Sequence, residues 1–350
     1  MTDLSPPAEV IAAELCGLDP AYAPTPLVNL PGLAADLGVA QVLAKDESRR
    51  MLGSFKSLGG TYAGLRALAR VAGAEVANLV KTRPPGQPTL ICASDGNHGL
   101  AVAAAARFAG ATARVYLHAG VPEARAQRIA DLGGEVVWVT GTYDDAVDAA
   151  AAGAQDGRGI LVADTSDDPQ EPIVGDVVAG YGVMAAEIRR QVDDAGHPRP
   201  THLFVQAGVG GLAAAMADGL GGWLAAPGAL VVVEPETAAC LTAAFAAERP
   251  VRVSGDLHTA AEMLSCGVAS APALAVLQRH RARILMVSEA TLAAAPQLLA
   301  VHGGPATSPS GAAGLAGAVA ALREPGRATE LGLDATSRLV ILITEGALME

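Results

Sequence analysis

Short apolar runs alternate along this chain with longer segments rich in alanine and leucine, and this alternation limits the possible folds more than any other feature. Nine runs have the length and composition of strands: QVLAKDE, PTLICAS, ARVYLHAG, EVVWVTG, GILVAD, HLFVQAG, ALVVVEP, RILMVSE and RLVILITEG. Their apolar residues are consecutive, which indicates strands that are covered on both faces. Such strands, separated by helices, predict an α/β fold with open, mostly parallel sheets flanked by helices.

Two polar stretches divide the expected fold into two domains. At 350 residues the chain is longer than a typical single domain. Between Pro88 and Asp164 lie four of the strand-like runs, with VKTRPPGQP before them and DTSDDPQEP after them. We therefore expect a small domain of residues 84–182, inserted in a large domain built from residues 1–83 and 183–350.

Composition excludes several classes of protein. The net charge of -12, without a basic cluster, argues against nucleic acid and anionic membrane surfaces as partners. The four cysteines form no CxxC pair, so we expect free thiols in a reducing compartment and no metal site. The N-terminus lacks the pattern of a secretory signal, and the most apolar window contains Asp218, glycines and a proline. These features predict a cytoplasmic protein without a membrane span.

The segment GSFKSLGG contains one of very few lysines in the chain. Among 24 lysines and arginines, lysine occurs only at Lys45, Lys56 and Lys81. Arginine therefore supplies most of the positive charge, but arginine cannot lose its proton and condense with an aldehyde, as a primary amine can. Lys56 is thus a candidate nucleophile. The alternative is a partly exposed lysine at the start of a helix.

Two further segments favour binding of an anionic group. ASDGNHG follows a strand and opens a helix, so its backbone N–H groups and the Asn97 amide can meet an anion. In QAGVGGL, glycines allow backbone amides to approach a phosphate closely. This loop lacks the GxGxxG pattern of dinucleotide-binding enzymes. Either segment alone has an ordinary structural explanation, but an amine, an anion-binding helix start and a phosphate loop together indicate pyridoxal 5'-phosphate.

The order of these motifs resembles that of a known superfamily. From AKDES through GSFKSLGGTYAG, SDGNHG and GVGGL to the final LITEG, the chain is similar to the fold-type-II pyridoxal-phosphate enzymes, the tryptophan synthase β superfamily. Further segments resemble the 2,3-diaminopropionate ammonia-lyases within it: GTYDDAV, DTSDDPQEPIVGDVVAGYGVM, VEP, MLSCG and SG. The resemblance extends over residues 23–346.

The resemblance implies roles for individual residues. Lys56 would form the internal aldimine with the cofactor, Phe55 would shape the pocket, and Asn97 would bond the ring hydroxyl. Thr344 would face the pyridine nitrogen, although a β-branched residue in a strand has a purely structural explanation as well. The backbone amides that would hold the phosphate belong to Gly208, Val209, Gly210, Gly211 and Leu212.

Two aspartates and one histidine complete the implied site. Asp95 and Asp164 match the acid/base groups of the ammonia-lyase subgroup, and Asp164 is associated there with the D-enantiomer. Two acids on opposite faces of a substrate would allow deprotonation of both enantiomers at Cα. Each aspartate alone also fits a helix cap or loop. For His98 a structural hydrogen-bonding role is the preferred interpretation.

The implied activity is β-elimination of 2,3-diaminopropionate, or of a close β-substituted amino acid, to pyruvate and ammonia by a homodimer. Alternatives are a serine/threonine dehydratase, a β-replacement synthase, or a catalytically silent protein that binds pyridoxal phosphate. The chain departs from the subgroup pattern near the expected site, so the substrate itself is in doubt. The departures are Asp167 for tryptophan, Pro169-Gln170 for Gly-Tyr, and Pro309 for glutamate.

Overall fold

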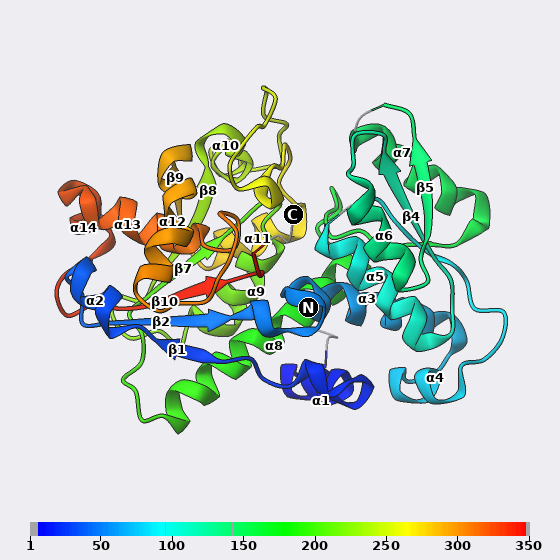
Figure 1. Ribbon diagram of the computed structural model, residues 1–350, viewed down its shortest axis with the longest axis horizontal. Coiled ribbons are helices and arrows are strands. Elements are labelled where there is room, and N and C mark those ends of the chain that lie inside the picture. Colours follow the sequence, from blue (N-terminus) through cyan, green and yellow to red (C-terminus); the bar gives the residue numbers. More distant parts are fainter. Residues whose placement is uncertain (1–5, 95, 142, 348–350) are drawn as a thin grey trace. The chain divides into compact units, whose positions relative to one another are not determined.

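A computed structural model of the chain describes residues 6–94, 96–141 and 143–347 (Figure 1). The chain divides into two compact units, each of which contains one sheet. The first unit consists of Met1–Ala23, Lys56–Ser166 and Gln170–Val183. The second consists of Pro24–Phe55, Asp167–Pro169 and Met184–Glu350.

The sheet of the second unit has six strands in the order β1-β2-β10-β7-β8-β9. β1 pairs antiparallel with β2, and the other neighbours are parallel. The strands are β1 (Leu27–Asn29), β2 (Gln41–Asp46), β7 (His202–Gln206), β8 (Ala229–Pro235), β9 (Arg283–Val287) and β10 (Arg338–Ile343). The helices are α2 (Pro31–Leu37), the second half of α8 (Pro172–Asp194), α9 (Gly211–Leu220), α10 (Cys240–Ala247), α11 (Ala271–Arg279), α12 (Glu289–Val301), α13 (Ala313–Arg323) and α14 (Pro325–Leu331).

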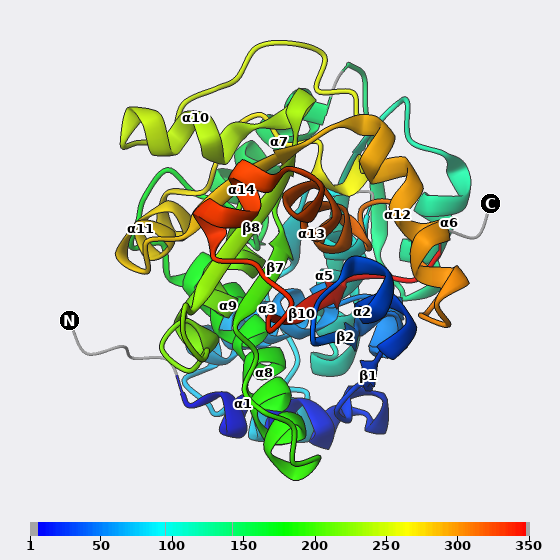
Figure 2. The ribbon, with the colours of Figure 1, turned by 90° about the vertical axis from the view of Figure 1, so that its left-hand side faces the viewer.

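Both faces of this sheet are covered by helices. Figure 2 shows α12 and α13 on one side of strands β7 and β8, and α9 on the other. Successive side chains of a strand point to opposite faces, and alternate strand residues belong to the core that includes α2, α12 and α13: Phe204, Val231, Val233, Leu339, Ile341 and Ile343. The residues between them are buried as well. This burial explains why the strand sequences are apolar without alternation.

The sheet of the first unit has four parallel strands in the order β5-β4-β3-β6. They are β3 (Leu90–Cys92), β4 (Ala113–His118), β5 (Glu135–Val139) and β6 (Ile160–Leu161). The helices are α1 (Ala8–Leu18), α3 (Lys56–Ala72), α4 (Val76–Thr82), α5 (Asn97–Ala109), α6 (Glu123–Asp131), α7 (Tyr143–Gly153) and the first half of α8.

Glycines allow α3 and α5 to pack closely within the first unit. A Cβ atom at Gly60 would lie 2.6 Å from the Cβ of Ala101, and one at Gly64 would lie 2.7 Å from that of Ala105. This packing joins residues 56–72 to the unit that holds the four-stranded sheet. The two units therefore contain different residues from the two expected domains, which were residues 84–182 and residues 1–83 with 183–350. Those domain boundaries stay a prediction.

All nine predicted runs form strands, which are β2 to β10. The two mostly parallel sheets with flanking helices confirm the α/β fold class. β1 was not predicted from the sequence, because a strand of three residues that is only partly buried has no apolar run to mark it. Across the described ranges, 6–94, 96–141 and 143–347, no helix combines the length and the apolar character that a membrane crossing requires.

Candidate active site

Lys56 and Asp164 lie in direct contact within the first unit. Lys56 is the first residue of α3, and Asp164 follows the short strand β6. The Nζ atom of Lys56 lies 2.5 Å from Oδ2 of Asp164, and each side chain is 24% exposed. A lysine amine and a carboxylate thus meet at a place that small molecules can reach.

The charge state of Asp164 follows from its surroundings. Burial by itself raises the pKa of this carboxyl, but the Lys56 ammonium, the nearby His98 and the hydrogen bond from Lys56 lower it more. The net result is a pKa well below the usual range of an aspartate, so Asp164 is a carboxylate at neutral pH. It can therefore accept a proton or hold an ammonium group.

The first turn of α5 brings two further polar residues of the first unit into place. Asn97 is the first residue of α5 and His98 the second. The Nε2 atom of His98 lies 2.8 Å from the carbonyl oxygen of Val162. A carbonyl oxygen can only accept a hydrogen bond, so in the neutral imidazole Nε2 carries the hydrogen and Nδ1 carries none. Asp95, the predicted acid/base of the same loop, lies outside the described residues.

His98 is a neutral residue that ties α5 to the segment before Asp164. Its side chain is 5% exposed, and burial lowers its pKa, although the charge of Asp164 opposes this shift. Nδ1 is buried and has no hydrogen-bond partner among the residues that the structure describes. The geometry supports the structural role that the sequence analysis preferred, because the bond to Val162 fixes the chain two residues before Asp164.

Tyr181 also borders this group and was not predicted from the sequence. It comes from α8 and is buried. Burial raises its pKa to about 12, although the positive charge of Lys56 opposes this shift. Gly59 provides room for the tyrosine ring, because a Cβ atom there would collide with it. The only signal in the sequence was an aromatic residue between two glycines, in AGYGVM.

The second unit carries the predicted phosphate loop between β7 and α9. Gly210 precedes the helix with a φ of 102° and, as a glycine, has no side chain with which to cap the helix start. The first N–H groups of a helix have no partner within it, so here they are available to an anion. A Cβ atom at Gly208 would lie 2.7 Å from Sγ of Cys266, which explains the need for glycine at this position. The loop, Gly208 to Leu212, fits a phosphate.

Thr344 lies directly after β10, and both its hydroxyl oxygen and its carbonyl oxygen accept hydrogen bonds. Its carbonyl oxygen accepts a hydrogen bond of 3.1 Å from the backbone N–H of Phe55. Its Oγ1 lies 3.0 Å from Nε2 of Gln206, the last residue of β7. Gln206 was not a predicted site residue; the available signal was a polar residue at the end of an apolar strand, just before the glycine loop.

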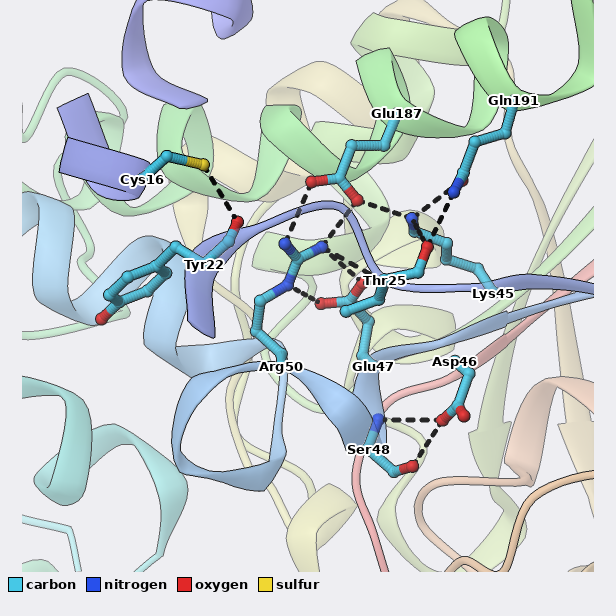
Figure 3. A network of polar contacts seen from close by, with 10 residues as sticks. All are labelled: Cys16, Tyr22, Thr25, Lys45, Asp46, Glu47, Ser48, Arg50, Glu187 and Gln191. Atoms are coloured by element: carbon cyan, nitrogen blue, oxygen red, sulfur yellow. Dashed lines mark hydrogen bonds and ion pairs between the residues drawn. The ribbon is translucent and has the colours of Figure 1, made fainter. Parts of the chain in front are cut away.

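A buried charge network holds the segment that leads to Phe55 and Lys56 (Figure 3). Arg50 donates two hydrogen bonds to Glu47, both of 2.8 Å, and two to Glu187, of 3.0 and 2.7 Å. Lys45 contacts Glu187 as well, with 2.5 Å between Nζ and Oε2. All four charged side chains are buried. The guanidinium fork of Arg50 thus fixes this segment five residues before Phe55.

The described site residues belong to two different units. The first unit contains Lys56, Asn97 and Asp164, and the second contains Phe55, Thr344 and the glycine loop. Each set has the chemistry that a part of pyridoxal phosphate requires. The first offers an amine for an aldehyde, and the second offers backbone amides for a phosphate and a neutral hydroxyl for a ring nitrogen.

Comparisons with known proteins agree with this chemistry. The family described as "Pyridoxal-phosphate dependent enzyme" matches residues 18–345. Diaminopropionate ammonia-lyase of Escherichia coli strain K12 is 32% identical over 342 residues, which cover 93% of this chain and 85% of that protein. The holo crystal structure of the Escherichia coli enzyme matches with a TM-score of 0.86 and 28% identity, over 99% of this chain and 90% of that one. A T.th. threonine deaminase matches with a TM-score of 0.78 and 27% identity, over 99% of each chain. This chain belongs to the pyridoxal-phosphate dependent enzymes.

Proposed function

We propose that this protein is an ammonia-lyase that converts 2,3-diaminopropionate, or a close β-substituted amino acid, to pyruvate and ammonia. One observation carries the proposal: the amine of Lys56 lies against the carboxylate of Asp164. That pair supplies both the amine that the cofactor needs and an acid/base group beside it. The names of the relatives support this substrate, since those from Escherichia coli and Salmonella typhimurium are diaminopropionate ammonia-lyases.

Pyridoxal phosphate, when bound, supplies the electron sink that makes the Cα proton of an amino acid acidic. The residues of this chain would hold and orient it. The Lys56 amine would bind the aldehyde carbon, the Asn97 amide would bond the ring hydroxyl, and Phe55 would border the ring. The Thr344 hydroxyl would face the ring nitrogen. The phosphate would accept hydrogen bonds from the amides of residues 208–212.

Proton transfer would fall to Lys56, Asp95 and Asp164. A base must take the proton from Cα, and the β-amine must be in its protonated form to depart as ammonia. The Lys56 ammonium keeps Asp164 a carboxylate of low pKa. When Lys56 binds the cofactor instead, that positive charge would be lost, and the carboxylate would become a stronger base for a substrate proton. The same negative charge would attract a cationic β-amine, a feature that favours diaminopropionate over serine, whose β-hydroxyl is neutral.

A serine/threonine dehydratase is the second candidate function. Threonine deaminase structures share the fold, and the sequence departs from the ammonia-lyase pattern at Asp167 and Pro309. The dehydratase would release water where the lyase releases its first ammonia. We further propose a homodimer located in the cytoplasm. Size-exclusion chromatography with light scattering would test the oligomeric state.

The visible spectrum of the purified protein, recorded before and after addition of D- or L-2,3-diaminopropionate or L-serine, tests the proposed function. Pyruvate and ammonia would be assayed in the same samples. We expect an absorbance band of the lysine-bound cofactor, a change with diaminopropionate, and one pyruvate and two ammonia molecules per substrate consumed. Rapid turnover of L-serine without turnover of diaminopropionate would support the dehydratase. A band that no substrate changes would contradict both activities.

A further inference from the structure

The side-chain amide of Gln206 lies at the convergence of three segments of the second unit. Its Nε2 atom is close to four oxygen atoms. The partners are the carbonyl oxygens of Ser310 (3.1 Å), Gly311 (2.9 Å) and Leu342 (3.2 Å) and Oγ1 of Thr344 (3.0 Å). Gln206 and Thr344 are both buried.

The chemistry of these partners settles which way the amide points. A backbone carbonyl oxygen only accepts hydrogen bonds, so the atom that faces three carbonyls must be the NH₂ group of the amide. An amide nitrogen has no free lone pair to offer to a hydroxyl. In the contact between Gln206 and Thr344, the nitrogen therefore donates and Oγ1 accepts. The hydroxyl hydrogen of Thr344 must point in another direction.

A second observation indicates that this arrangement is maintained at a cost. The Oε1 atom of Gln206 is buried and has no hydrogen-bond partner among the described residues. An unsatisfied buried acceptor destabilises a fold, because it has lost its hydrogen bonds to water without replacement. The amide also needs space, since a Cβ atom at Gly314 would lie 3.0 Å from Oε1. A buried amide with an unsatisfied oxygen calls for an explanation, and a role at the site is one.

We infer that Gln206 is a positioning residue that makes the Thr344 hydroxyl a hydrogen-bond donor toward the ring nitrogen of pyridoxal phosphate. The inference rests on the proposed function, in which Thr344 faces that nitrogen. The Gln206 amide occupies one of the two lone pairs of the hydroxyl oxygen and cannot take its hydrogen, so the hydroxyl has its hydrogen to offer to the ring. A ring nitrogen that accepts this hydrogen carries no proton of its own. Gln206 would thereby determine the protonation state of the cofactor without contacting it.

Solid-state NMR of the holoenzyme tests this inference, with pyridoxal phosphate labelled with ¹⁵N in the ring. In Gln206→Met the hydroxyl loses its donor and can give its hydrogen to one of the freed carbonyls, so its lone pair faces the ring. We expect the ¹⁵N chemical shift to move toward that of a protonated pyridinium. Gln191→Met is the matched control, because the Gln191 amide also donates to a carbonyl, that of Thr25, at 2.8 Å. It should keep the wild-type shift.

A wild-type ¹⁵N shift in cofactor-loaded Gln206→Met would overturn the inference. Should that variant fail to fold, Gln206→Glu provides the same test, because a carboxyl facing three carbonyls has at most one hydrogen to donate. Thr344→Val separates the inference from the proposed function. An unchanged shift in Thr344→Val would show that Thr344 does not face the ring nitrogen. A changed shift there, with none in the Gln206 variants, would reject the role of Gln206 alone.

Discussion

The Nζ atom of Lys56 lies 2.5 Å from Oδ2 of Asp164, a residue 108 positions further along the chain. The pair stands where helix α3 begins and the chain leaves strand β6. A carboxylate in this position stabilises the protonated form of the amine, and it stays beside the amine as a proton acceptor once that amine has bound an aldehyde and lost its charge. The contact therefore joins two steps of the proposed chemistry, cofactor attachment and proton transfer.

Replacement of Lys56 by alanine should abolish the absorbance band of the lysine-bound cofactor and all turnover. Asp164, the other side chain of the pair, is a carboxylate and cannot replace the amine that binds the aldehyde. The measurement is the visible spectrum after incubation with pyridoxal phosphate and removal of the excess. Lys81→Ala, at an exposed position of α4, is the control and should behave as the wild type. A band and activity that survived in Lys56→Ala would refute the assignment of this lysine.

Asp164→Asn should keep the cofactor band but lose catalysis with the D-form of 2,3-diaminopropionate. General acid–base groups contribute about 10²- to 10⁴-fold to rates, so we expect kcat for the D-form to fall at least about 100-fold. The L-form should be affected less. Asp148→Asn on α7, at an exposed position, serves as the control. Normal turnover of the D-form by Asp164→Asn would remove this residue from the mechanism.

Gly210→Ala should weaken cofactor binding through the backbone. Gly210 has a φ of 102°, a conformation that alanine adopts with strain of about 1–3 kcal/mol. Relief of the strain would turn the amides of the loop, so the affinity for pyridoxal phosphate should fall about tenfold or more. Fluorescence titration would measure it. Gly222→Ala is the matched control, because a Cβ atom there meets nothing within 4 Å. Equal affinities in the two variants would contradict the phosphate role of the loop.

Arg50→Met should destabilise the protein strongly, because it leaves Glu47 and Glu187 buried with Lys45 as their remaining cation in the network. Loss of one partner from a buried ion pair lowers the free energy of unfolding by about 3–5 kcal/mol. The neighbouring Arg49→Met provides the control, since the Arg49 side chain is 75% exposed and lies 3.8 Å from Asp46. Its effect should stay below about 1 kcal/mol. Chemical denaturation would compare the two, and similar losses would argue against the network.

His98 should make the cofactor-free protein less stable in mild acid. Burial lowers the pKa of His98 in the folded protein, whereas the pKa is about 6.5 in an unfolded chain. Below that pH the unfolded state binds more protons, so the free energy of unfolding falls as the pH drops from about 7 to 5. His98→Gln should reduce this slope, and the exposed His258→Gln should not. Identical slopes in all three proteins would contradict a buried neutral histidine.

The local pattern of the sequence was sufficient to predict the strands and the glycine loop. Consecutive apolar residues mark a strand buried on both faces, and all nine such runs form strands. The loop could be predicted because only glycine readily adopts the φ of 102° seen at Gly210. Both features depend on residues that are close in sequence.

The partners of the charged and polar residues could not be predicted in this way. Arg50 and Glu187 are separated by 137 positions. Nothing in the sequence near either residue indicates which of the 36 acidic residues pairs with which arginine or lysine. The same holds for Gln206 and Thr344, which are separated by 138 positions. Gln206 and Thr344 meet because parallel strands bring their C-terminal ends to one edge of a sheet. Arg50 and Glu187 meet because the segment after β2 lies against helix α8.

The sequence by itself thus determined the α/β class, the candidate lysine and the cofactor chemistry, since each follows from the type and local order of residues. The tertiary structure alone decided that Asp164 would accept from Lys56, that Arg50 would be buried between two carboxylates, and that an amide would face Thr344. Side-chain partners are set by where the packed strands and helices place them. That placement depends on the whole chain, so no short segment contains it.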